Sequence, residues 1–184
     1  MKRGIVVKPI IFPHVNSHCQ LDLIDLQSHP DGEFKFILNY QDYLSKFVSL
    51  QALKTKTADE VAYNLLDIFT IFGASAVLQS DNGREICNSV IECPKEIWAE
   101  LKIVHGKPRH SQGQGSVERA NQDVKNMVFA WCKDNGTTKW SQGLRFVQFQ
   151  KNRAFHSGIK RSPFEAMFGC LPKVGLKDSS HFIL

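Results

Sequence analysis

The alternation of apolar and polar residues predicts five short strands. Residues 18–26 and 34–40 have strand-like apolar patterns, and residues 47–50 are expected to return antiparallel to the second of these segments. Shorter apolar runs at 76–80 and 101–104 predict two further strands. Because helical patterns separate the later strands, the order indicates an α/β domain with a mixed five-stranded sheet flanked by helices.

Helices are predicted where apolar residues recur at intervals of three and four. Thr57–Glu60 has the sequence of a capping box at the start of one helix, and Gly73 is expected to end that helix. A glycine-containing loop over 105–116 precedes a long helix from about Val117, which places Glu118 in its first turn. The other predicted helices cover residues 86–100, residues 140 to about 155, and a short segment from Ser162 to Gly169.

Composition and charge narrow the class of partner. The chain has 184 residues and 42% hydrophobic content, which suits one domain with an adequate core. Residues 1–101 hold nine Lys and Arg against thirteen Asp and Glu, a net charge of −4. Residues 102–184 hold fourteen against five, a net charge of +9, so the second half supplies a surface suited to an anionic partner.

The sequence contains no signal for a membrane or for secretion. No apolar run reaches the length needed to span a bilayer, and the N-terminal apolar stretch is too short for a secretory signal. The five cysteines are scattered and form no Cys-x-x-Cys pair. We therefore expect reduced thiols in an intracellular protein that does not contact membranes.

Three carboxylates stand where a metal site could form. Asp22 interrupts an apolar strand, Asp81 follows the strand 76–80, and Glu118 lies on the long helix with Asn121 and Lys125 on its face. Acids on strands and on a helix suit a two-metal phosphoryl-transfer site. Each acid also has a plainer interpretation: Asp-Asn-Gly is ordinary turn sequence, and an acid at a helix start is favoured by the helix dipole. Asp25 is the alternative to Asp22 within the first strand.

Several motifs together resemble the catalytic core of retroviral and retrotransposon integrases, which belong to the DDE superfamily. They are Gln20–Asp22, Ser80–Gly83, Ser111–Glu118, Asn152–His156 and Ser162–Gly169. The stretches His105–Gln112 and Lys151–Pro163 are similar to the integrase-derived region of the KRAB-A domain-containing protein 2 and SCAN domain transposon-derived group. The interval of 36 residues between Asp81 and Glu118 is one longer than the commonest in the family, which a loop can absorb.

The resemblance implies a ribonuclease-H-like fold and a division of the chain into three parts. Residues 1–17 are an N-terminal leading segment, 18–157 the integrase catalytic core, and 158–184 a C-terminal extension with a short helix. Integrases of this type usually carry a zinc-binding module upstream of the core. Because no such module is visible, we expect a core cut from a longer, transposable-element-derived protein. The resemblance also implies a dimer or higher oligomer and a nuclear location.

The resemblance further implies an activity and its residues. Asp22, Asp81 and Glu118 are expected to bind Mg²⁺ or Mn²⁺ and to catalyse phosphodiester cleavage and DNA strand transfer. The alternative is a domesticated, catalytically silent domain that binds DNA or protein. Gln114, Asn121 and Lys125 match positions near the DNA in integrases. Arg109 and Lys107 are further candidates for DNA contact, although they could equally be solvated surface charges.

Overall fold

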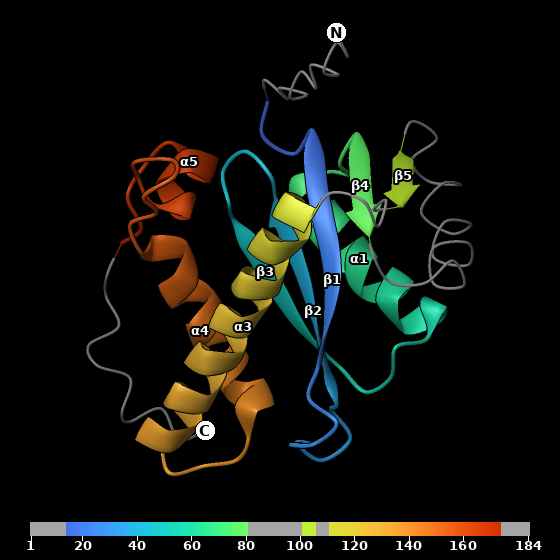
Figure 1. Ribbon diagram of the computed structural model, residues 1–184, viewed down its shortest axis with the longest axis vertical. Helices are drawn as coiled ribbons and strands as arrows, with labels where there is room; N and C mark the ends of the chain where they lie inside the picture. The colour runs from blue at the N-terminus through green and yellow to red at the C-terminus, as the bar shows by residue number, and fades with distance from the viewer. Residues whose placement is uncertain (1–13, 81–100, 106–110, 174–184) are drawn as a thin grey trace, which may run out of the picture.

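Five strands of the described residues form one mixed sheet. The structure is a computed structural model that describes residues 14–80, 101–105 and 111–173, with only the backbone course for 105 and 111–117. The strand order is β3-β2-β1-β4-β5 (Figure 1). β1 pairs antiparallel with β2, and β2 with β3, whereas β4 is parallel to both β1 and β5. The strands are β1 His18–Asp25, β2 Phe36–Asp42, β3 Val48–Leu53, β4 Val77–Ser80 and β5 Lys102–His105.

Helices cover both faces of this sheet and close two apolar cores. Helix α1 (Ala58–Phe72) lies on one face, and α3 (Ser111–Asp134) and α4 (Trp140–Arg153) lie on the other (Figure 1). The short α5 (Pro163–Phe168) follows α4. Successive side chains of β1 point to opposite faces of the sheet and so enter different cores. Leu21 packs with residues of α1, and Ile24 packs with residues of α3 and α4. The mixed sheet with helices on both faces is the predicted arrangement, which the structure therefore confirms.

Helix α3 begins earlier than the sequence pattern predicts. The expected loop over 105–116 is wrong for residues 111–116, which form the first turns of a 24-residue helix. Each glycine costs a helix about 1 kcal/mol relative to alanine, but a long helix gains one hydrogen bond for each residue that extends it. Glu118 therefore lies beyond the first turn, which contains no acidic residue. Since the helix dipole acts mainly within that turn, it does not explain Glu118.

Where the structure describes them, the other helix boundaries lie at the capping and glycine residues that the sequence predicts. Gly73 ends α1 with φ +79°, and its N–H donates to the carbonyl of Phe69. Ser162 Oγ accepts a hydrogen bond from the backbone N–H of Glu165, and Gly169 ends α5 in the left-handed region. The predicted turn after Ser80 and the predicted helix 86–100 lie outside the described residues. Within the described residues, no helix combines the length and apolar character needed to cross a bilayer.

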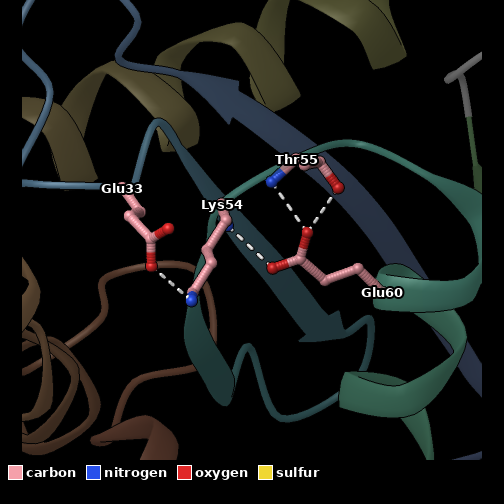
Figure 2. A network of polar contacts seen from close by, with 4 residues as sticks. All are labelled: Glu33, Lys54, Thr55 and Glu60. Carbon is pink, nitrogen blue, oxygen red and sulfur yellow. Dashed lines mark hydrogen bonds and ion pairs between the residues drawn. The ribbon is translucent and has the colours of Figure 1, made fainter.

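The predicted capping box at the start of α1 is wrong. Thr57 is the N-cap residue, but its side chain accepts no capping hydrogen bond. The Glu60 carboxylate turns instead to the segment after β3, where it accepts from the backbone N–H groups of Lys54 and Thr55, both at 2.7 Å (Figure 2). Thr55 Oγ1 also donates to this carboxylate, and Lys54 Nζ pairs with Glu33. Two backbone donors in a turn outcompete the single donor of a capping box.

Replacing Glu60 by Gln should make the stability less dependent on pH. Burial would raise the pKa of Glu60, but the hydrogen bonds from Thr55 and Lys54 outweigh it and lower that pKa. The stabilisation is therefore complete above the unfolded pKa and is lost as pH falls through the folded pKa. Denaturant unfolding at pH 7 should show a loss of about 1 kcal/mol for Glu60→Gln. The control is Asp67→Asn, which removes an exposed acid of α1, and it should unfold at the midpoint of the unmutated chain. A difference that persists unchanged at pH 3 would contradict this role for Glu60.

Side-chain amides of α4 bind the backbone of the edge strand β3. Asn152 Oδ1 accepts from Val48 N–H and Asn152 Nδ2 donates to Val48 C=O, both at 2.8 Å. One helical turn earlier, Gln148 Oε1 accepts from Leu50 N–H at 2.7 Å. The four-residue spacing on the helix matches the two-residue spacing on the strand, because each spans about 6 to 7 Å. These bonds satisfy backbone groups that point away from β2.

Candidate active site

Asp22 is a buried carboxylate at the centre of the sheet. It lies on β1 on the same face as Ile24 and therefore faces the α3 side of the sheet. Only 8% of its surface is exposed, and Gln20 Nε2 lies 3.5 Å from Asp22 Oδ1. A carboxylate held there must be compensated by hydrogen bonds or by a cation, since removing its charge from water is costly.

Asn39 connects the Asp22 region with helix α3. It is the register partner of Asp22 on β2 and is 2% exposed. Its Nδ2 donates a hydrogen bond to Asn121 Oδ1 at 2.9 Å, whereas its own Oδ1 has no hydrogen-bond partner. Glu118 lies three residues before Asn121 and so shares its side of α3, with an exposed side chain. The link therefore brings the part of α3 that carries Glu118 alongside the strand that carries Asp22.

The third predicted carboxylate, Asp81, lies outside the described residues. Its predecessor Ser80 is the last residue of β4 and is the register partner of Leu21, the residue before Asp22. The structure thus pairs the two residues that directly precede Asp22 and Asp81 in the chain. Convergence of all three carboxylates stays a prediction.

Asp25, the alternative to Asp22, has a different environment. It lies at the exposed end of β1, where its carboxylate accepts from the backbone N–H and the Nε2 of Gln27, both at 2.8 Å. The hydrogen bond from the Gln27 backbone is the main cause of the lowered pKa of Asp25, and Lys125 contributes. Asp22 and Asp25 point to opposite faces of the strand because they are three positions apart, and successive side chains of a strand alternate between its faces. Asp25 therefore serves the turn after β1.

The predicted DNA-contact residues fall into two groups. Lys107 and Arg109 lie outside the described residues, as does the side chain of Gln114. Lys125 is half-buried on α3, and the Asn121 side chain is engaged with Asn39. Asn39 itself was not predicted as a site residue, because the alternating pattern assigns it to the polar face of its strand. The signal that could have identified Asn39 is its position as a polar amide within the otherwise apolar run of β2.

The candidate metal ligands among the described residues are all oxygen atoms, which a hard cation prefers. Asp22 and Glu118 supply carboxylates, and the free Oδ1 of Asn39 is an amide oxygen opposite Asp22 in the sheet register. This donor chemistry fits Mg²⁺ or Mn²⁺. Among the described residues, no group of three or more His, Cys, Asp or Glu side chains is assembled that could hold a metal ion. Because Asp81 is not among them, the proposed triad is not tested by that result.

Comparisons with known proteins agree with the fold and the motifs. No family model matches the chain. The chain is 50% identical over 179 residues to KRAB-A domain-containing protein 2 of Homo sapiens, covering 97% of this chain and 36% of that protein. It is 28% identical over 158 residues to the Gag-Pol polyprotein of feline leukemia virus, covering 85% of this chain and 9% of the polyprotein. The chain thus spans a minor part of either relative.

A solved structure shows the same fold. The HTLV-2 integrase catalytic core domain, in complex with magnesium and in a trimeric form, superposes with a TM-score of 0.67 at 17% identity. The alignment covers 83% of this chain and 96% of that domain. The chain therefore has the ribonuclease-H-like fold of an integrase catalytic core, as the motifs predicted. More particularly, it is a homologue of a segment of human KRAB-A domain-containing protein 2.

Proposed function

We propose that this chain is the core of a metal-dependent polynucleotidyl transferase that cleaves phosphodiester bonds and joins DNA strands. One observation carries the proposal: the buried Asp22 lies between the β4 end that leads to Asp81 and the part of α3 that carries Glu118. Two-metal phosphoryl transfer uses an arrangement of this kind, with one acid within a strand, one directly after a strand and one on a helix. The similarity to retroviral polyproteins and to an integrase core supports it.

In this proposal Asp22, Asp81 and Glu118 would hold two Mg²⁺ or Mn²⁺ ions. Such ions make the attacking water or DNA 3′-hydroxyl more acidic and stabilise the leaving oxygen. The HTLV-2 core in complex with magnesium supports this choice of cation. The protein's own contribution is position, because the hydrogen bond between Asn39 and Asn121 fixes α3 against the sheet and so limits the distance from Glu118 to Asp22. The reaction is a direct displacement and needs no covalent bond to the enzyme.

DNA is the proposed partner, and the basic second half of the chain is its proposed surface. Lys125 and Asn121 lie on α3 on the side of Glu118, and Gln114, Arg109 and Lys107 precede them in the chain. Cationic side chains on such a surface displace counterions from the phosphate backbone. The trimeric form of the HTLV-2 core supports an oligomer. Chromosomal DNA as the substrate would place the chain in the nucleus.

A second candidate function is a domesticated domain that keeps the fold and binds DNA or protein without catalysis. The observation that favours it is the 50% identity to a protein of Homo sapiens, compared with 28% to a viral polyprotein. The two candidates differ in whether the carboxylates bind metal.

Crystals soaked in Mn²⁺ would test the proposed site directly. Anomalous scattering should place Mn²⁺ between Asp22, Asp81 and Glu118, since all three are expected as ligands. Any two of these carboxylates more than roughly 10 Å apart could not share a two-metal centre, and the catalytic proposal would then be wrong. Clustered carboxylates that bind no Mn²⁺ would favour the silent domain.

A further inference from the structure

A cavity of about 340 Å³ opens beside the proposed active site, between the β2–β3 turn, α3 and the end of α4. Gln41 and Lys46 line it from β2 and the turn, and Arg119 and Asp123 line it from α3. Lys151 of α4 and Phe155, just after α4, also face it. Ligand pockets typically measure about 300 to 1,000 Å³, so this cavity can hold a group the size of one nucleotide.

Cations outnumber anions among these lining residues. Lys151 Nζ lies 3.5 Å from Asp123 Oδ2, so the carboxylate of Asp123 already has a cationic partner. Lys46 Nζ lies over the Tyr43 ring, 4.2 Å from its centroid, and burial lowers the pKa of Lys46 although nearby Asp42 opposes this. With the exposed Arg119, the lining has an excess of about two positive charges. Such an excess in a partly desolvated cavity favours an anion.

Phe155 adds an aromatic surface that the apolar cores do not use. It is 71% exposed and belongs to neither core cluster. An exposed ring beside cations is the combination that binds unpaired nucleic acid strands, in which bases stack on aromatics and phosphates meet positive charge. A phosphate alone would leave this ring without a role.

The cavity adjoins the proposed carboxylates along both the strand and the helix. Gln41 lies two residues beyond Asn39 on β2, about 7 Å along the strand. Arg119 follows Glu118 directly on α3. Figure 1 shows α5, the β2–β3 turn and the start of α3 at one end of the sheet. A strand cut at the carboxylates could therefore place a neighbouring nucleotide in the cavity.

We propose that this cavity binds one nucleotide of an unpaired DNA strand, with its phosphate against Lys46, Arg119 and Lys151 and its base stacked on Phe155. The assignment to a DNA strand rests on the proposed function. The binding itself involves neither the carboxylates nor a metal ion, so the two proposals can fail separately.

Fluorescence anisotropy with a labelled oligothymidylate of about ten nucleotides, in EDTA, tests this site. Phe155→Ala should weaken binding about tenfold, because one stacked base is lost, and Phe155→Tyr should restore it. Lys46→Gln should also weaken binding and should lower the slope of affinity against salt by about 0.7, the value for one phosphate on a single strand. Matched controls are Tyr63→Ala, an exposed aromatic on α1, and Lys56→Gln, an exposed lysine before α1. Both should bind as the unmutated chain does.

The outcomes separate the alternatives. Unchanged binding by Phe155→Ala, or equal loss in Tyr63→Ala, overturns the proposal. Weakening by Lys46→Gln without weakening by Phe155→Ala identifies a site for phosphate alone and also overturns it. An abasic oligonucleotide whose affinity no longer depends on Phe155 supports the stacked base. Because the assay contains EDTA and no cleavage is measured, binding that depends on Phe155 upholds this site whatever becomes of the catalytic proposal.

Discussion

Glu118→Gln is expected to abolish cleavage and joining of DNA strands by this chain in Mg²⁺ or Mn²⁺. Glutamine keeps the shape of the side chain and loses the charge that would hold the metal. Losing such a ligand should cost several kcal/mol of transition-state stabilisation, which corresponds to a rate loss of about a thousandfold or more. Removing an exposed charge from the surface costs about 0 to 1 kcal/mol. The measurement is the rate of strand cleavage and joining on labelled duplex DNA.

Asp25→Asn is the matched control for this variant. Asp25 is an acid on the same strand as Asp22, but it is exposed and serves the turn after β1. Its removal should leave the rate nearly unchanged. Equal activity in Glu118→Gln and the unmutated chain would show that the cleavage arises elsewhere. If neither is active, Mn²⁺ calorimetry decides, because a site lost in Glu118→Gln means a competent core and no site means the silent domain.

Asn152→Asp is expected to destabilise the fold far more than the same change at an exposed position. The buried amide both accepts from Val48 N–H and donates to Val48 C=O, and Asn152 is 2% exposed. Aspartate keeps the acceptor, loses the donor and sets a carboxylate oxygen against a carbonyl oxygen. A buried charge without a partner costs about 3 to 5 kcal/mol. Denaturant unfolding at pH 7 measures the loss as a shift in the midpoint.

Gln150→Glu is the control, because it makes the same amide-to-acid change two residues away on the exposed side of α4. Its unfolding midpoint should remain within about 0.5 kcal/mol of the original stability. An Asn152→Asp chain as stable as Gln150→Glu would mean that the two bonds to Val48 contribute little.

The strands were predictable because each carries a short apolar run between turn residues, as β1 and β4 do. The sequence also indicated Asp22 as a candidate, since a carboxylate inside such a run requires compensation. The local pattern could not predict which of several hydrogen-bond partners a side chain binds when those partners belong to different elements of the fold. Glu60 has the position of a capping residue, yet its carboxylate binds the turn after β3 because two donors lie there. Local sequence contains no information on that turn's position in space.

Asn39 and Ser111 illustrate two further limits. The polar side chain of Asn39 suggested a solvent-facing strand position, but α3 covers that face and supplies Asn121 as its partner. Only the packed arrangement reveals such a pair. The start of α3 was missed because glycines at 113 and 115 lower helix propensity locally, whereas the length of the whole helix favours its extension.

The amides that α4 places on β3 also restrict how copies of this chain can associate. An uncovered edge strand is a template on which another chain can add a strand, and this leads to aggregation. Asn152 and Gln148 occupy backbone groups of Val48 and Leu50 that an added strand would need. A continuous sheet across two copies therefore cannot form along this part of β3 while α4 is in place. A chain shortened before α4 would lose this cover, and it should aggregate through β3.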